Sequence, residues 1–173
     1  GPPPAELPGI DLAVASQLAL LDRLAEAVPG PLRPRPGPSN RYGFENEFFG
    51  ACDGTVLDAM LRRFRPARLV EVGSGHSTSV VLDAREALGG LPSLTLVEPH
   101  PERLLELARP GDLDGVTLVR ERLEDVDRSL FAGLGAGDVL FVDSTHVSRV
   151  GSDVNVLLLE VLPALAPGVL VHV

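Results

Sequence analysis

A glutamate precedes a glycine-rich turn in the segment VEVGSGHST, residues 70–78. The run before the turn is short, branched and apolar, which is typical of a buried strand. Gly73 and Gly75 allow a tight turn that a ligand can approach, and the hydroxyl residues after them can cap a following helix. Ligands of open parallel sheets bind beyond the carboxyl ends of the strands. The segment therefore predicts a ligand-binding loop with the carboxylate of Glu71 beside it.

The charge of Glu71 helps to distinguish two classes of ligand. A dinucleotide site favours the spacing G-x-G-x-x-G, with pyrophosphate on the helix N-terminus, but Thr78 occupies the third glycine position here. A carboxylate repels pyrophosphate and attracts an ammonium or sulfonium group. We therefore predict a small nucleoside ligand that is positively charged at its other end. The alternative is that Glu71 forms an ion pair with an arginine such as Arg62.

Further chemistry-bearing residues follow later apolar runs. Glu98 ends LTLVE and is a candidate acceptor for ribose hydroxyls, or alternatively a cap for the helix at Pro101. Asp143 follows VLFV, where it can face a ligand or organise the loop. His146 and His172 are candidate general bases because imidazole titrates near neutrality, although a histidine in a loop can equally be structural.

The elements that position these residues alternate in type. Strand-like runs at 67–73, 93–99, 116–123, 138–144 and 169–173 alternate with helix-like segments at 77–90, 101–110, 124–134 and 152–168. This alternation predicts a doubly wound, mostly parallel, Rossmann-like α/β sheet in three layers. Two helices are expected before it, over residues 11–28, with Asp11 as N-cap, and over 53–64. We expect an N-terminal helix and Pro/Gly-rich linker over 1–40 and one α/β domain over 41–173.

Composition excludes several classes of protein. The net charge of −9 argues against a broad basic surface for nucleic acid. Lysine is absent, which excludes a lysine Schiff base, and Cys52 is the only cysteine, which we expect to be packed. No apolar run approaches the ~18 residues of a membrane span, and the first residues do not resemble a signal peptide. We therefore expect a cytoplasmic protein without a membrane partner, and the Ala-, Gly-, Pro- and Arg-rich composition suggests a bacterial source.

The segment E71-V-G73-S-G75 resembles the first motif of class I S-adenosylmethionine-dependent methyltransferases, and the resemblance extends over about residues 41–173. A bacterial small-molecule subgroup is similar in the block NEFFGACD, in DSTH after the fourth strand and in the fifth strand. The resemblance implies S-adenosylmethionine as cofactor and methyl transfer to an oxygen or nitrogen of a small molecule. It implies cofactor contacts by Glu71, Gly73, Ser74, Gly75, His76, Glu98, Pro99, Arg122, Leu123, Glu124 and Asp143, and catalytic roles for Asp143, His146 and His172.

Two matters stay open on the sequence alone. Asn46, Phe49 and Asp53 of the block can form a lid over the cofactor or serve packing and capping. Sheets of the family have seven strands, whereas this sequence ends within the fifth, so we expect the last two strands to be absent and the natural protein to be longer. An inactive cofactor-binding or scaffold module is therefore an alternative, and an NAD(P)-dependent oxidoreductase is a third. We expect no metal site; the acceptor, activity and any homo-oligomer are not determined.

Overall fold

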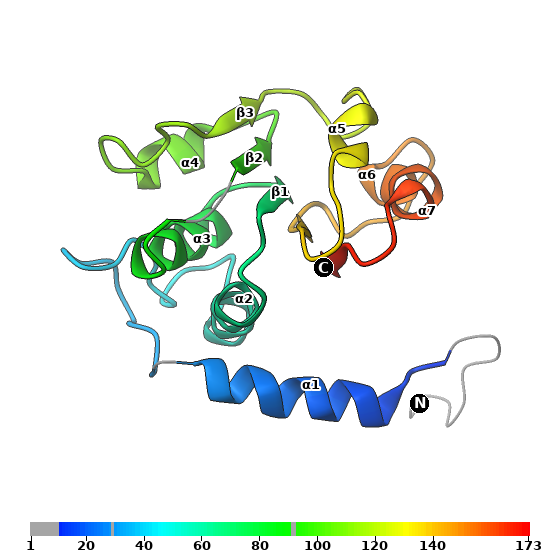
Figure 1. Cartoon of the computed structure of the whole chain (residues 1–173). Coiled ribbons are helices and arrows are strands. Elements are labelled where there is room, and N and C mark those ends of the chain that lie inside the picture. Colours follow the sequence, from blue (N-terminus) through cyan, green and yellow to red (C-terminus); the bar gives the residue numbers. More distant parts are fainter. Residues whose placement is uncertain (1–10, 29, 91–92) are drawn as a thin grey trace, which may run out of the picture.

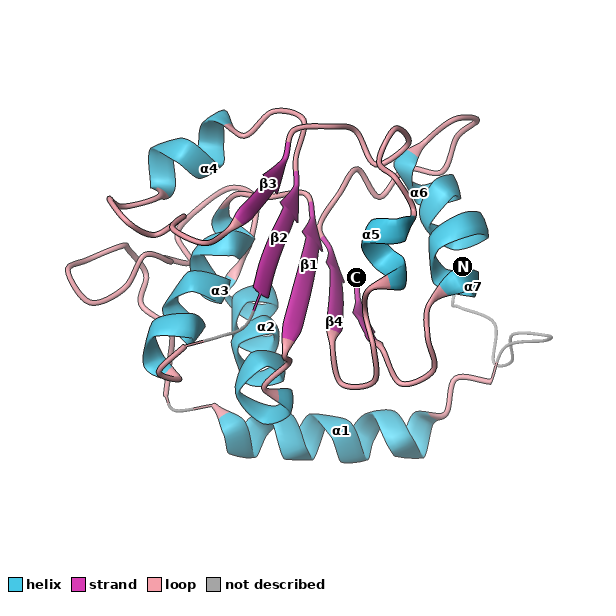
Figure 2. Cartoon of the chain, turned by 45° about the horizontal axis from the view of Figure 1, so that its top comes forward, coloured by secondary structure: helices cyan, strands magenta, loops and turns pink. Residues whose placement is uncertain are grey.

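The computed structural model describes residues 11–28, 30–90 and 93–173, and its centre is a five-stranded sheet (Figure 1). The strand order is β3-β2-β1-β4-β5, and every neighbouring pair is parallel. The chain therefore fills one side of β1 first and then the other, which places a topological switch point between β1 and β4. Figure 2 shows the strands side by side and pointing the same way. The strands are β1 (Arg68–Val72), β2 (Ser93–Val97), β3 (Thr117–Val119), β4 (Val139–Val142) and β5 (Leu170–His172).

Helices cover both faces of the sheet, which confirms the predicted three-layer α/β fold. Alternate residues of β4 separate the two cores: Phe141 packs with α2, α3 and α4, whereas Leu140 and Val142 pack with α5 and the helical turns after β4. The helices are α1 (Val14–Ala27), α2 (Ala51–Phe64), α3 (His76–Ala87), α4 (Glu102–Leu107), α5 (Ser129–Ala132), α6 (Asp153–Val156), η1 (Leu157–Val161) and α7 (Leu162–Ala164).

The N-terminal helix differs from its prediction at its start. Asp11 is not its N-cap, because α1 begins at Val14 and the residue before it, Ala13, has left-handed backbone angles. Asp11 instead accepts a 2.8 Å hydrogen bond from the Ala13 N–H, which tightens the turn before the helix. In both views α1 lies outside α2, away from the sheet (Figures 1 and 2). No helix in the described part of the chain is long and apolar enough to cross a membrane.

Three further predictions need correction. Cys52 is exposed rather than packed, because it lies in the first turn of α2 on the side away from the core. The helix expected over 124–134 is reduced to the single turn of α5. The helix expected over 152–168 has Ser152 as its N-cap, whose side chain accepts from the Asn155 N–H, but it widens into a π-turn before Pro163. Proline cannot donate to the fourth residue before it, and a π-turn accommodates that loss.

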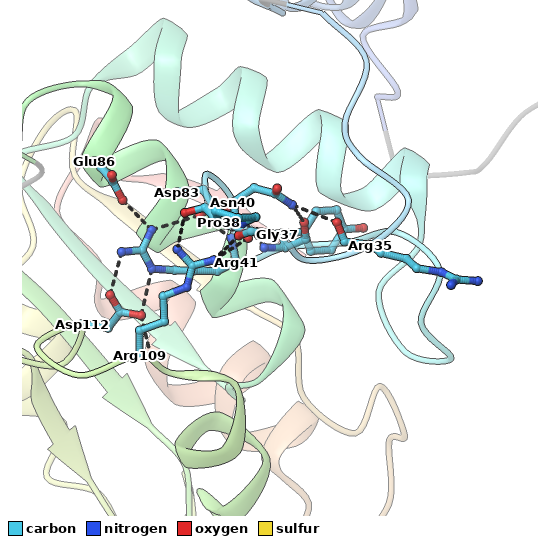
Figure 3. Close-up of polar contacts among 10 residues, drawn as sticks. Arg35, Gly37, Pro38, Asn40, Arg41, Asp83, Glu86, Arg109 and Asp112 are labelled. Carbon is cyan, nitrogen blue, oxygen red and sulfur yellow. Dashed lines mark hydrogen bonds and ion pairs between the residues drawn. The ribbon is translucent and has the colours of Figure 1, made fainter.

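A network of ion pairs holds the segment before α2 against the domain (Figure 3). The Arg41 guanidinium contacts Asp83 and Glu86 of α3 and Asp112 of the α4–β3 loop, at 3.1, 2.7 and 2.6 Å. Arg109 donates to the backbone carbonyls of Gly37, Pro38 and Asn40. The proline-rich segment is thus fixed on α3, and it sets the position of residues 43–50 above the carboxyl ends of the strands.

Candidate functional site: two cavities that meet at Asp143

The first turn after β1 brings two strands unusually close. Gly73 has a φ of +83°, and a Cβ at this position would lie 1.9 Å from the carbonyl oxygen of Asp143. The backbone N–H of Gly73 donates to Val97, and that of Asp143 donates to Val72, at 2.9 and 2.8 Å. Only glycine fits here, since any side chain would collide with the backbone that follows β4. The turn thereby joins the ends of β1, β2 and β4.

Glu71 is fully buried beneath the first turn of α3. Its Oε1 accepts hydrogen bonds from the hydroxyls of Ser77 and Thr78, at 2.7 and 3.0 Å. Burial is the main cause that raises the pKa of Glu71 from 4.5 to about 8, while the two hydroxyls oppose the shift. The alternative pairing with Arg62 is wrong, because Arg62 binds Asp58 one turn away at 2.7 Å. Glu71 therefore links β1 to α3, and at neutral pH its carboxyl carries a proton.

Unsatisfied polar atoms gather at one end of the sheet. In the part of the chain that the structure describes, three buried side-chain atoms have no hydrogen-bond partner, namely Glu71 Oε2, Ser74 Oγ and His172 Nδ1. All three belong to the carboxyl ends of β1 and β5 or to the loop after β1. An unpaired buried polar group costs about 1–3 kcal/mol, so such groups are rare in native proteins. Their clustering makes this end of the sheet the candidate functional site.

The first cavity lies over the ends of β1, β2 and β4 and has a volume of about 470 Å³. Glu98 is held in its wall: Oε2 accepts from the Ser74 N–H at 3.0 Å and Oε1 from the His100 N–H at 2.8 Å. These bonds use only part of the acceptor capacity of a carboxylate, so Glu98 can still accept from a ligand. The other lining residues are Val72, Gly73, Val97, Pro99, His100, Arg122, Leu123, Glu124, Asp143, Ser144, Thr145, Arg149, Ser152 and Asp153.

A second cavity of about 480 Å³ lies over β4 and β5. Val142 and Asp143 both line this second cavity. Asp143 lines the first cavity too, so the two cavities meet at the end of β4. The remaining lining residues are Phe48, Phe49, Asp53, Val56, Phe141, His146, His172 and Val173. Ligands in the two cavities would therefore face each other across one carboxylate.

Two histidines border the second cavity. His146 Nε2 lies 3.7 Å from Asp143 Oδ1. The imidazole is half-exposed, and the backbone of His146 has a φ of +54°. His172 packs edge-on against Phe141, with ring centroids 5.0 Å apart. Burial lowers the pKa of His172 below 6.5, although the charges of Asp53 and Asp143 oppose the shift. His172 is consequently neutral at pH 7 and able to accept a proton.

The residues of the NEFFGACD block, 46–53, make different contacts within the chain. Asn46 closes its own turn through hydrogen bonds with Gly43, Phe48 and Phe49, and Asp53 accepts from the Gly50 N–H at the start of α2. Phe49 is buried against Phe141. Packing and capping therefore describe what Asn46, Phe49 and Asp53 do within the chain.

The aromatic ring that points outward is Phe48. It stacks on His76, with ring centroids 6.0 Å apart, and the Arg103 guanidinium lies 3.7 Å from its centre. Phe48 thus lies over the loop after β1 and forms part of the wall of the second cavity. Burial lowers the pKa of His76, and the charge of Arg103 adds to the effect.

Comparison with known proteins identifies the family to which this α/β domain belongs. Residues 70–173, more than half of the chain, match the methyltransferase domain family. The chain belongs to this family. It is 30% identical over 135 residues to an uncharacterized protein of Archaeoglobus fulgidus, and the alignment covers 75% of this chain but only 60% of that protein. The SAH-bound methyltransferase PaMTH1 of Podospora anserina matches with a TM-score of 0.51 over 97% of this chain and 72% of that chain, at 15% identity, which concerns the fold.

Most of the site residues that the sequence analysis named line one of the two cavities of this methyltransferase domain. The first cavity brings together Gly73, Glu98 and Asp143 with three residues after β3 and with Pro99. Glu71, Ser74, Gly75 and His76 are not among the described residues that line it, so their contacts with a cofactor remain predictions. The polar and aromatic residues at the cavities that the sequence did not single out include Phe48, Arg103, Ser144, Thr145 and Ser152.

Asp153, which the sequence suggested as a partner of Arg149 or of an anionic substrate, also lines the first cavity of the methyltransferase domain. Its carboxylate accepts from the N–H and the hydroxyl of Thr145, at 3.0 and 2.6 Å, and so holds the loop after β4 against α6. Hydrogen bonds with Thr145 lower the pKa of Asp153 despite its burial. The sequence carries one signal for this contact, since Ser152 and Asp153 start the first helix after the DSTH segment.

Proposed function

We propose that the protein is an S-adenosylmethionine-dependent methyltransferase that acts on a small-molecule acceptor through oxygen or nitrogen. The observation that carries this proposal is the pair of cavities of similar size that share Asp143. A two-substrate transfer needs such an arrangement, because donor and acceptor must be held in contact and in line. Membership in the methyltransferase domain family and the SAH-bound state of the Podospora anserina methyltransferase support the choice of cofactor.

The residues of the first cavity fit the cofactor. Glu98 retains free acceptor positions for ribose hydroxyls, and the backbone and apolar side chain of Leu123 offer a surface for adenine beside Arg122 and Glu124. Gly73 lines this cavity, and the unpaired Ser74 Oγ follows it in the loop after β1, along which the methionine portion would extend. Both cavities fall within the ~300–1,000 Å³ typical of small-ligand sites.

The reaction places specific demands on the residues around Asp143. When bound, S-adenosylmethionine supplies a methyl carbon to which the acceptor lone pair bonds while the carbon–sulfur electron pair returns to sulfur. An O–H or N–H acceptor must also lose a proton. The neutral imidazole of His172 is suited to take that proton, and His146 beside Asp143 is the second candidate. Asp143 would position the acceptor where the two cavities meet.

Calorimetric titration of the chain with S-adenosylhomocysteine, S-adenosylmethionine and NAD tests the cofactor. We expect micromolar binding of the two adenosyl-sulfur compounds and much weaker binding of NAD, because Thr78 replaces the third glycine of a dinucleotide loop. Binding of NAD alone would overturn the proposal in favour of an oxidoreductase. Binding of the adenosyl-sulfur compounds without turnover of any acceptor would favour the second candidate, an inactive cofactor-binding or scaffold module.

A further inference from the structure

We propose that the acceptor is an uncharged aromatic molecule with a free hydroxyl group, bound in the second cavity between Phe48 and the end of β5. This inference rests on the proposed function, since it names the acceptor class for the same transfer. It follows from the shape and the chemistry of the cavity walls.

The walls favour a flat apolar ring. Phe48, Phe49 and Phe141 contribute aromatic surface, and Val56 adds an aliphatic side chain. Phe49 and Phe141 are fixed by their edge-on contact, with ring centroids 6.2 Å apart. Phe48 is 60% exposed, although the His76 ring and the Arg103 guanidinium lie against its own ring. A large exposed aromatic side chain at a cavity mouth is well placed to stack on a ligand ring. Aliphatic acceptors would lose this stacking.

The polar groups of the walls demand a hydrogen-bond donor. Asp53 and Asp143 present carboxylate oxygens, and the neutral imidazole of His172 offers one acceptor nitrogen. Among the described residues that line the cavity there is no arginine, and the Arg103 guanidinium is engaged on the Phe48 ring. A ligand carboxylate or phosphate would therefore meet two like charges without a compensating cation.

A hydroxyl group satisfies these walls better than an amine does. A hydroxyl proton can be donated to His172 or Asp143 and then removed by the neutral imidazole, which leaves an oxygen lone pair free to form the new bond. A protonated amine would be attracted by the two carboxylates, but its lone pair is blocked until a proton is lost. The geometry therefore assigns the cavity to phenol-like acceptors.

Three probes with one ring system test the proposal: 2-naphthol, 2-naphthoate and protonated 2-naphthylmethylamine, with cyclohexanol as the aliphatic comparison. Binding to the whole chain is measured at pH 7.5 by ligand-observed NMR and calorimetry, with and without S-adenosylhomocysteine. We expect 2-naphthol to bind at least 10-fold more tightly than 2-naphthoate and cyclohexanol, and to be methylated in the presence of S-adenosylmethionine when the protonated amine is not. Tighter binding of the naphthoate, or methylation of the amine without methylation of 2-naphthol, would overturn the assignment to an uncharged hydroxyl acceptor.

Two variants link the result to the cavity. Phe48→Ala should weaken 2-naphthol at least 5-fold, whereas Phe64→Ala, which removes an aromatic ring outside the lining residues, should leave it unchanged. Asp53→Asn should strengthen 2-naphthoate by removing one repelling charge while its amide still accepts from the Gly50 N–H. Equal effects of the two phenylalanine variants, or an unchanged naphthoate affinity, would contradict the proposal.

The outcome separates the two levels of inference. If S-adenosylhomocysteine binds and 2-naphthol does not, the acceptor class is wrong and the methyltransferase proposal stands. If S-adenosylhomocysteine does not bind, the proposed function itself fails, whatever the probes do.

Discussion

The hydroxyl of Ser77 donates a 2.7 Å hydrogen bond to Oε1 of Glu71, beneath the loop after β1. Thr78 donates to the same oxygen, and its own hydroxyl oxygen accepts from the Gly75 N–H at 3.1 Å. One carboxyl oxygen thus fixes the first turn of α3 and, through it, the turn that borders the first cavity. The other oxygen is buried without a partner. A proton on this carboxyl lets it occupy a site where a charge would be poorly solvated.

The buried carboxyl predicts a pH-dependent stability difference between the wild-type protein and Glu71→Gln. The pKa of Glu71 is 4.5 when unfolded and about 8 when folded, so between these values only the folded state holds the proton. The contribution of Glu71 is therefore fully present below pH 4.5 and is lost as pH rises toward 8. We expect Glu71→Gln to gain roughly 3–5 kcal/mol relative to the wild type over this interval, measured by urea denaturation.

Glu106→Gln is the matched control, because Glu106 is exposed on α4. Its free energy of unfolding should follow the wild type at every pH. A constant difference between Glu71→Gln and the wild type from pH 5 to 8 would show that Glu71 is ionised in the folded protein.

The close approach of Gly73 to Asp143 predicts a second pair of variants. Gly73→Ala places a Cβ 1.9 Å from a carbonyl oxygen, whereas Gly89 has a φ of +74° with open space around it. Gly89→Ala should cost about 1 kcal/mol for backbone strain alone. Gly73→Ala should cost more than 3 kcal/mol or prevent folding, because the strand ends must separate. Denaturation midpoints and soluble yield measure both, and similar losses would contradict the crowding at the end of β4.

The fold was predictable because its signals are local. Branched apolar runs such as that of β1 specify buried parallel strands, and the residues between them have helical spacing and stop signals. Glycines, Glu98 and Asp143 follow the strand ends, so the sheet topology alone brings them to one edge. That explains why Gly73, Glu98 and Asp143 of the first cavity were anticipated from the sequence.

The second cavity was less predictable because it depends on tertiary placement. Phe48 and Phe49 are neighbours with similar sequence character, and only the packing of Phe49 against Phe141 directs Phe48 outward. The charge expected at Glu71 also depended on solvation, which the sequence does not give, and full burial raises its pKa. Asp153 reaches Thr145 through the loop after β4, and its spacing matches no common motif.

Glu98 carries the third prediction. Replacement by alanine removes the acceptor for the Ser74 N–H as well as the proposed ribose contact. We expect the dissociation constant of S-adenosylhomocysteine to rise roughly 10- to 100-fold, equivalent to about 1.4–2.8 kcal/mol, by calorimetry. Glu106→Ala, on the exposed side of α4, should bind as the wild type does. An unchanged affinity of Glu98→Ala would remove Glu98 from the cofactor site.

The Arg41 network carries the fourth prediction. Arg41 is only 12% exposed and contacts three carboxylates, of which Asp112 is the most buried. Alanine at this position leaves Asp83 and Asp112 without their cation, so we expect a loss of roughly 2–4 kcal/mol in unfolding free energy. Arg41→Lys should recover less than half of this free energy, because an ammonium cannot bind both carboxylate oxygens of Asp112 as the guanidinium does. Arg120→Ala, at an exposed residue, should have little effect; a comparable loss there would argue against the network.

His172 gives the last prediction, which depends on an acceptor being found. Burial keeps its pKa below 6.5, so a base at this position is neutral and active over the whole neutral range. The turnover rate should be flat above pH 7 and should fall about tenfold per pH unit below the pKa, as the imidazole gains its proton. His172→Gln should abolish this acidic limb and lower turnover roughly 10²- to 10⁴-fold. It should leave the affinity for S-adenosylhomocysteine within about 3-fold, because His172 lies outside the lining of the first cavity. If the acidic limb persists in His172→Gln and disappears in His146→Gln, the proton instead passes to the imidazole that lies 3.7 Å from Asp143.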